Sequence, residues 1–147
     1  MTRSASVYQR FGAWIVGPYS RMTSGLWVAT DPFIRFPVSV GYPRLAREAR
    51  AAIARSRTIP YVNLRDTQLP LPDPILEAAG VKSWATFHKG AKLVSLTSDD
   101  DQIAVSPNIN KGAREGFIPL PDDIVVPATA TIDALGEAIE QAFAACR

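Results

Sequence analysis

The sequence predicts one α+β domain, residues 1–147, in which a mainly antiparallel sheet is packed by two amphipathic helices. Two observations predict this class. Two long segments carry apolar residues at helical spacing, whereas much of the remaining chain consists of short apolar runs that end at proline or glycine. A chain of 147 residues can bury a sufficient core without disulfides or metals, and its 12 prolines keep the elements short.

The first part of the chain is expected to hold short strands. We interpret part of residues 7–16 as a strand that ends at Gly17-Pro18. Residues 25–29 form a second short apolar run. The run at 33–36 alternates apolar and polar side chains and is closed by a proline, which favours an edge strand.

Residues 43–57 predict the clearest helix of the first half. Pro43 suits a first helical turn, where its missing N–H removes no hydrogen bond, and a proline at position 60 ends the segment. The two sides of this helix differ in character, with Leu45, Ala49, Ala52 and Ile53 on one side and Arg44, Arg47, Arg50 and Arg57 on the other. The apolar side is therefore expected to face the core.

The middle of the chain combines extended and helical signals. We expect a strand at 61–64 and an extended, proline-rich loop at 66–74. A short helix at 75–79 should stop at Gly80, and Ser83 is a candidate N-cap for a further helical turn.

The second half predicts a hairpin, a third strand and a terminal helix. Residues 92–96 and 102–106 alternate apolar and polar side chains, so the acidic segment between them is expected to be a hairpin tip. Residues 108–116 read as a polar loop, 116–120 as a strand, and 122–131 as less regular structure.

The last helix is predicted at 132–145, with Thr131 as its N-cap and Asp133 in its first turn. Its apolar and acidic faces consist of Ile132, Leu135, Ile139, Ala142 and Phe143 on one side and Asp133, Glu137 and Glu140 on the other.

Groups for catalysis are scarce in this sequence. His88 is the only conventional general base near neutral pH, and Cys146, the single cysteine, is the penultimate residue, a poor place to hold a nucleophile against a base. The acidic run Asp99 to Asp101 lacks the spacing of an EF-hand, whose twelfth position would be Asn110 here. We therefore predict no catalytic residue, no metal site and no cofactor.

The charges are unevenly divided along the chain. Residues 1–60 hold nine arginines and two acids, a net charge of +7, whereas residues 61–147 carry −5. Such asymmetry can mark a partner-binding surface, or the two halves can pack so that their charges interleave. A nucleic-acid-binding module that uses the arginine-rich half is the alternative function, although no aromatic residues interleave with the arginines of 43–57.

Three features favour a cytoplasmic protein. No window approaches 18 uninterrupted apolar residues, the first ten residues lack the apolar core of a secretory signal, and one cysteine cannot form an internal disulfide. We therefore expect no membrane segment.

The order of short motifs in residues 84–145 resembles the immunity proteins of contact-dependent growth inhibition (CDI) systems. The resembling segments are Trp84 with Phe87-x-Lys89-Gly90-Ala91-Lys92-x-Val94-x-Leu96, then Ile103-x-Val105-x-Pro107, then Asn110-Lys111-Gly112-Ala113-Arg114-x-Gly116-Phe117-x-Pro119-Leu120-Pro121, and finally Leu135-Gly136-x-Ala138-Ile139-x-x-Ala142-Phe143. The resemblance covers about the last two-fifths of the chain.

The resemblance implies a non-enzymatic cytoplasmic protein that binds and neutralises the C-terminal toxin domain of a cognate effector. The toxin domains that such proteins bind are often nucleases. It does not imply which residues bind the toxin. From charge alone we predict that Asp99, Asp100 and Asp101 meet a basic toxin surface, with Asp122 and Asp123 as weaker candidates, because carboxylates can compete for the cations that hold phosphates. The competing interpretation is a solvated turn that keeps the hairpin soluble.

Overall fold

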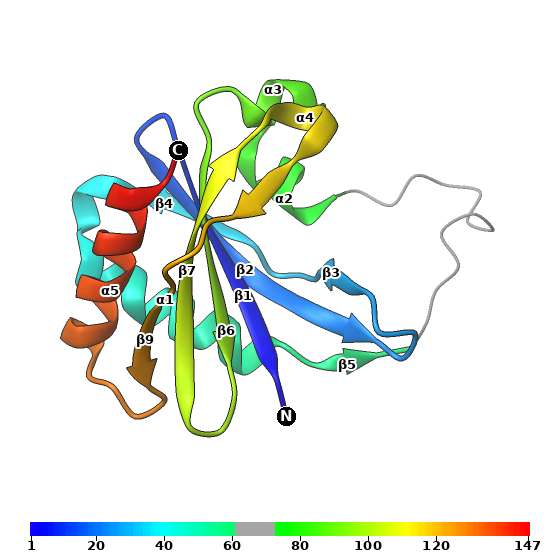
Figure 1. The fold of residues 1–147 in the computed structure, drawn as a ribbon. Coiled ribbons are helices and arrows are strands. Elements are labelled where there is room, and N and C mark those ends of the chain that lie inside the picture. Colours follow the sequence, from blue (N-terminus) through cyan, green and yellow to red (C-terminus); the bar gives the residue numbers. More distant parts are fainter. Residues whose placement is uncertain (61–72) are drawn as a thin grey trace.

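The computed structural model describes residues 1–60 and 73–147 and confirms the α+β class (Figure 1). A curled, mainly antiparallel sheet is flanked by helices on both faces. The strand predicted at 61–64 and most of the loop predicted at 66–74 lie outside the described residues.

Four long strands form the centre of the sheet. In spatial order they are β2 (Ala13–Met22), β1 (Arg3–Arg10), β6 (Lys92–Ser98) and β7 (Gln102–Asn110), and each pairs antiparallel with its neighbour. Short strands extend the edges: β3 (Trp27–Ala29), β4 (Ile34–Pro37) and the parallel β5 (Thr58–Ile59) pair with β2, while β8 (Phe117–Pro119) and β9 (Ile124–Pro127) pair with β7.

The segment 7–16, part of which was expected to be a strand, contributes to two strands. It holds the end of β1 and the start of β2, joined by a two-residue turn, Phe11-Gly12, in which both residues have positive φ. This is the backbone pattern of a type I′ turn, whose twist matches that of the flanking strands. The sequence pattern did not show this break, because apolar residues stand on both sides of Gly12.

The predicted stop at Gly17-Pro18 is wrong, because Pro18 lies within β2 opposite Ala5. The carbonyl of Pro18 accepts a hydrogen bond from the N–H of Thr30, so the nitrogen of Pro18 faces the same edge, away from β1. Strand β4 pairs with β2 only up to position 16 and β3 only from position 19, so the missing N–H falls between them. The proline therefore leaves out only the reciprocal bond to the carbonyl of Thr30, at the end of the β2–β3 ladder.

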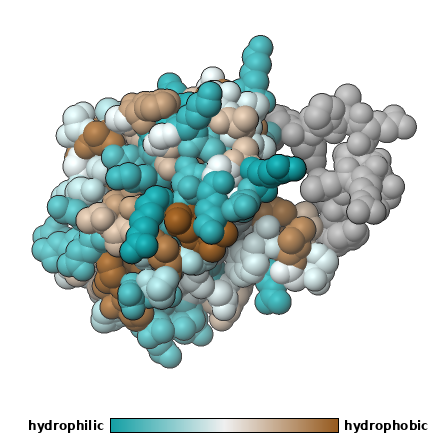
Figure 2. All heavy atoms as spheres, turned by 45° about the horizontal axis from the view of Figure 1, so that its top comes forward, coloured by the Kyte–Doolittle hydropathy of each residue, from teal (hydrophilic) through white to brown (hydrophobic). Residues whose placement is uncertain are grey.

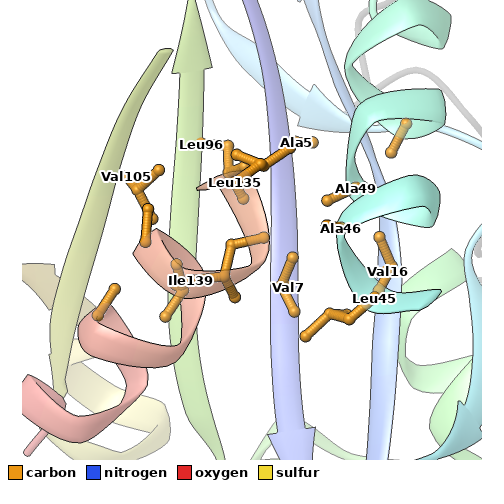
Figure 3. Packing of buried hydrophobic residues seen from close by; sticks show 14 of the residues in the cluster. Ala5, Val7, Val16, Leu45, Ala46, Ala49, Leu96, Val105, Leu135 and Ile139 are labelled. Carbon is orange, nitrogen blue, oxygen red and sulfur yellow. The ribbon is translucent and has the colours of Figure 1, made fainter. Parts of the chain in front are cut away.

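Helices α1 (Tyr42–Arg55) and α5 (Ile132–Ala145) lie side by side on one face of the sheet and form the main core with it. Their buried side chains meet alternate residues of the central strands in Figure 3, namely Leu45, Ala46, Ala49, Leu135 and Ile139 against Ala5, Val7, Val16, Leu96 and Val105. The terminal helix has its predicted bounds, and the hydroxyl of Thr131 accepts the N–H of Ala134 as the predicted cap. Both predicted amphipathic helices are thus present, although α1 ends at Arg55, two residues before its predicted end, so Arg57 lies outside the helix.

Three short helices cover one end of the opposite face: α2 (Pro74–Ala79), α3 (Trp84–His88) and α4 (Gly112–Glu115). They bury a second cluster around Tyr8, Ile15, Ile75, Phe87 and Leu93. A 3₁₀ turn at Val38–Val40 leads into α1.

Residues 108–116 are not a polar loop, as predicted, but the end of β7 and helix α4. Two of its polar side chains, those of Asn108 and Asn110, are hydrogen-bonded within the fold, whereas the charged residues of α4 are exposed. The side-chain amide of Asn108 donates to the carbonyls of Leu93 and Ser106, and its exposed fraction is 2%. Similarly, the segment predicted as irregular, 122–131, contains strand β9.

Candidate partner-binding surfaces

The acidic tip of the β6–β7 hairpin has the predicted location, but its three carboxylates differ in role. The carboxylate of Asp99 accepts hydrogen bonds of 2.8 Å from the backbone N–H groups of both Asp101 and Gln102. These bonds hold the pKa of Asp99 below its ordinary value, because they favour the charged form. Asp99 therefore organises the turn.

Asp100 and Asp101 are the outward-facing charges of this tip. Both residues are exposed, and the carboxylate of Asp100 lies 3.8 Å from the amino group of Met1, with 90% of its side chain accessible. An ion pair this exposed contributes little to folding. These two carboxylates are therefore free to contact another molecule.

Asp122 and Asp123 are exposed as well, but the fold does not bring them to the hairpin tip. They come just before β9, at the end where Ile124 pairs with Val105. The hairpin tip lies at the other end of β9, where the carbonyl of Asp101 accepts the N–H of Ala128. The four residues of β9 thus separate the two acidic sites by about 13 Å. One small basic patch on a partner could not neutralise both.

A third acidic surface lies in a shallow groove between α5 and the start of α1. The groove has a volume of about 230 Å³ and is lined by Tyr42, Pro43, Asp133, Gly136, Glu137 and Glu140. Partial burial raises the pKa of the Tyr42 phenol, and the negative charge of Glu140 adds to this effect. The sequence shows the acidic face of α5, but only the packing of α1 beside α5 makes that face one side of a groove.

His88 is fixed by Asn110 and has no catalytic partner among the residues that the structure describes. The amide nitrogen of Asn110 donates to the carbonyls of His88 and Ala91, at 2.7 and 2.9 Å, so its oxygen is the atom 2.9 Å from His88 Nδ1. That oxygen can only accept, so Nδ1 carries the proton. The imidazole stacks on Phe117 at 4.5 Å, and within the described residues no nucleophile is hydrogen-bonded to it.

Cys146 is half-buried, and its thiol donates to the carbonyl of Leu93. Burial raises the pKa of this thiol, which keeps it protonated and unreactive. Across residues 1–60 and 73–147, no three His, Cys, Asp or Glu side chains are grouped so as to hold a metal ion. None of the helices there is long and apolar enough to cross a membrane.

Several arginines of the first half have structural tasks. Arg50 donates to the carbonyl of Ala130, and Arg3 donates to that of Ala54, so both join α1 to neighbouring segments. Arg44 pairs with Glu48 at 3.3 Å and lies over the Phe36 ring. These contacts weaken the alternative in which the arginine-rich helix is a nucleic-acid surface.

Comparison with known proteins shows a family match and two structural neighbours. A family model described as CDI immunity protein (CdiI) matches residues 29–146, about four-fifths of the chain. A protein of unknown function from Neisseria meningitidis has the same fold, with a TM-score of 0.77 and 18% identity over 100% of this chain and 96% of the other. A chain from a CdiA-CT/CdiI toxin and immunity complex of Yersinia pseudotuberculosis has a TM-score of 0.75 and 15% identity over 100% and 98%.

No match was found among curated proteins. The two structural neighbours are too distant in sequence to show more than the fold, whereas the family model spans both helices of the main core and the strands from β4 to β9. The chain therefore belongs to the CDI immunity protein family, CdiI.

Proposed function

We propose that this protein binds the toxin domain of a cognate CDI effector and neutralises it without catalysing a reaction. The observation that carries the proposal is the family match over residues 29–146. A second observation supports it, since a chain of the same fold comes from a complex of CDI toxin and immunity protein. Its place of action would be the cytoplasm, in keeping with a single cysteine that has no partner for an internal disulfide.

The chemistry of the described residues supports inhibition by binding alone. His88 has an orienting partner in Asn110 but no nucleophile, and the Cys146 thiol is kept protonated by burial. Covalent catalysis needs a nucleophile within hydrogen-bond reach of a base. An inhibitor needs only a complementary surface.

We further propose that the toxin is a nuclease and that exposed carboxylates of this protein meet its cationic groups. The hairpin tip is the first candidate contact, through Asp100 and Asp101, and Asp122 and Asp123 form a separate, weaker candidate. Nucleases hold phosphates with cationic side chains, and carboxylates bind the same side chains through charge-assisted hydrogen bonds.

The function is tested by co-expressing the chain with its cognate toxin domain. We expect the two to co-purify and the purified toxin to degrade RNA or DNA only when the immunity protein is absent. His88→Ala should protect cells as well as the native chain does. Loss of protection by that variant, with unchanged stability and toxin affinity, would contradict inhibition by binding alone.

The contact is tested with the pair Asp100→Asn and Asp101→Asn, which leaves the turn-forming Asp99 in place. Rim charges act mainly through the association rate, so we expect slower association at low salt and a smaller difference at high salt. Glu115→Gln, an exposed change on α4, is the matched control. If association and dissociation match those of the control at both salt concentrations, the tip lies outside the interface.

A further inference from the structure

A basic cavity lies beside the β1–β2 turn. Its volume is about 480 Å³, and its lining includes Arg10, Phe11, Arg35, Pro37 and Ala79. Figure 2 faces the end of the molecule that carries this turn and shows hydrophilic side chains around smaller apolar areas. No acidic residue lines the cavity within the described chain.

The sheet register explains why two arginines that are far apart in sequence meet here. Tyr8, Ile15 and Arg35 lie in one row across β1, β2 and β4, and Arg10 lies two positions beyond Tyr8 on the same face. The Cα atoms of Arg10 and Arg35 are therefore about 12 Å apart, two strand spacings across and two residues along. Side chains of this length can approach one molecule from both sides.

Both guanidinium groups are held in place by backbone carbonyls rather than by carboxylates. Arg10 donates to the carbonyls of Phe87 and Thr86 at 3.1 Å each, near the end of α3. Arg35 donates to the carbonyl of Ala79, the last residue of α2, at 3.3 Å. These bonds occupy fewer than half of the N–H groups of each guanidinium, and neither group has an ion-pair partner among the described residues.

Phe11 gives the rim of the cavity an apolar side. Its exposed fraction is 72%, yet the ring is held by the Arg10 guanidinium at 4.5 Å and by Gly90. A Cβ at position 90 would lie only 2.7 Å from the ring, so the absence of a side chain there makes room for Phe11. An exposed aromatic ring next to arginines is typical of protein-interface hot spots, which are enriched in aromatic residues and arginine.

From this geometry we infer that the cavity between Arg10 and Arg35 receives a carboxylate side chain, Asp or Glu, of the toxin domain. The inference rests on the proposed function, because the toxin is the partner that function supplies. The charge of the site selects an anion, and the paired guanidiniums suit a planar carboxylate bound through more than one hydrogen bond. Phe11 covers the apolar part of the same partner segment. The protein thus meets its toxin through cationic as well as acidic groups.

The test measures binding kinetics of the cognate toxin with Arg35→Gln, which removes the charge but retains a polar side chain. Arg47→Gln is the matched control, an exposed arginine on α1 with no ion pair within the described residues. Loss of one partner from a desolvated charge pair should raise Kd at least about thirtyfold, mainly through faster dissociation. Arg10→Lys is a second variant, which keeps a charge near α3, and should weaken binding less than Arg35→Gln does.

The partner atom is identified by double-mutant cycles in which each Asp and Glu of the toxin is changed to Ala against Arg35→Gln. One toxin acid should couple to Arg35, so that the double variant loses no more affinity than the single ones. Native-like kinetics for Arg35→Gln would overturn the inference, as would the absence of any coupled acid. The inference would also be overturned if Arg35→Gln weakened binding to RNA and left binding to the toxin unchanged. Failure of the native chain to bind the toxin would instead refute the proposed function itself.

Discussion

The docking of the last helix can be tested at Phe143, whose side chain α5 buries in the main core. Its exposed fraction is 4%, and it belongs to the cluster that joins α1, α5 and the central strands. Phe143→Ala removes most of a buried aromatic ring. The surrounding side chains come from both helices and from the sheet, so they cannot collapse freely into the space left behind.

The expected loss follows from two opposed effects. Truncation of a buried Phe to Ala costs about 3–5 kcal/mol, counting the lost burial and the cavity. Alanine is the better helix former, which returns about 0.5 kcal/mol at most. The loss of burial and the cavity outweigh the gain in helix propensity, so the variant is less stable. For a chain of this length each kcal/mol of lost stability lowers Tm by about 2–4 °C, so the melting temperature should fall by roughly 5–20 °C.

Thermal melts followed by circular dichroism measure this change, with Gln141→Ala as the control because Gln141 is exposed on the same helix. Exposed substitutions usually change stability by less than about 0.5 kcal/mol. If the two variants melt within a degree or two of each other, α5 does not pack against the sheet as described.

Two further predictions concern local polar contacts. Thr131→Ala removes the hydroxyl that accepts the N–H of Ala134 and should lower stability by about 0.5–2 kcal/mol, as read from urea unfolding; an unchanged midpoint would show that the cap contributes nothing. The pKa of Asp99 is lowered in the folded state, so its stabilising effect is present above the unfolded pKa and is lost as pH falls through the folded pKa. The stability difference between the native chain and Asp99→Asn should therefore shrink from pH 6 to pH 3, and a pH-independent difference would contradict a charge-based role.

Helical periodicity proved the most informative signal in this sequence. The bounds 132–145 and the Thr131 cap agree with the structure, because apolar spacing and a capping hydroxyl are both local properties. The β6–β7 hairpin was predicted for the same reason, although β7 runs four residues further than expected, to Asn110. Strand ends are set by pairing with distant residues, which local alternation does not report.

The errors came from residues whose usual meaning is overridden by tertiary contacts. Proline normally interrupts a strand, but the missing N–H of Pro18 falls at the end of the β2–β3 ladder, just beyond the paired residues of β3 and β4. Asn108 and Asn110 normally indicate a loop, but here their side-chain amides bind backbone carbonyls of the β6 strand and the turn before it. In both cases the deciding partner lies more than ten residues away along the chain.

The acidic and the basic candidate surfaces differ in how far the sequence could predict them. Asp99, Asp100 and Asp101 are adjacent in sequence, so their joint exposure at one tip could be predicted. Arg10 and Arg35 become neighbours only because β4 pairs with β2 in a register that places Arg35 opposite Ile15. The two surfaces also lie at opposite ends of β1, about 25 Å apart, since Arg3 pairs with Ser98 beside the tip and Arg10 ends at the turn. Parallel measurements on the tip and cavity variants therefore locate the toxin on the molecule: a loss confined to one set places it at that end, and losses in both require a toxin surface that spans the length of β1.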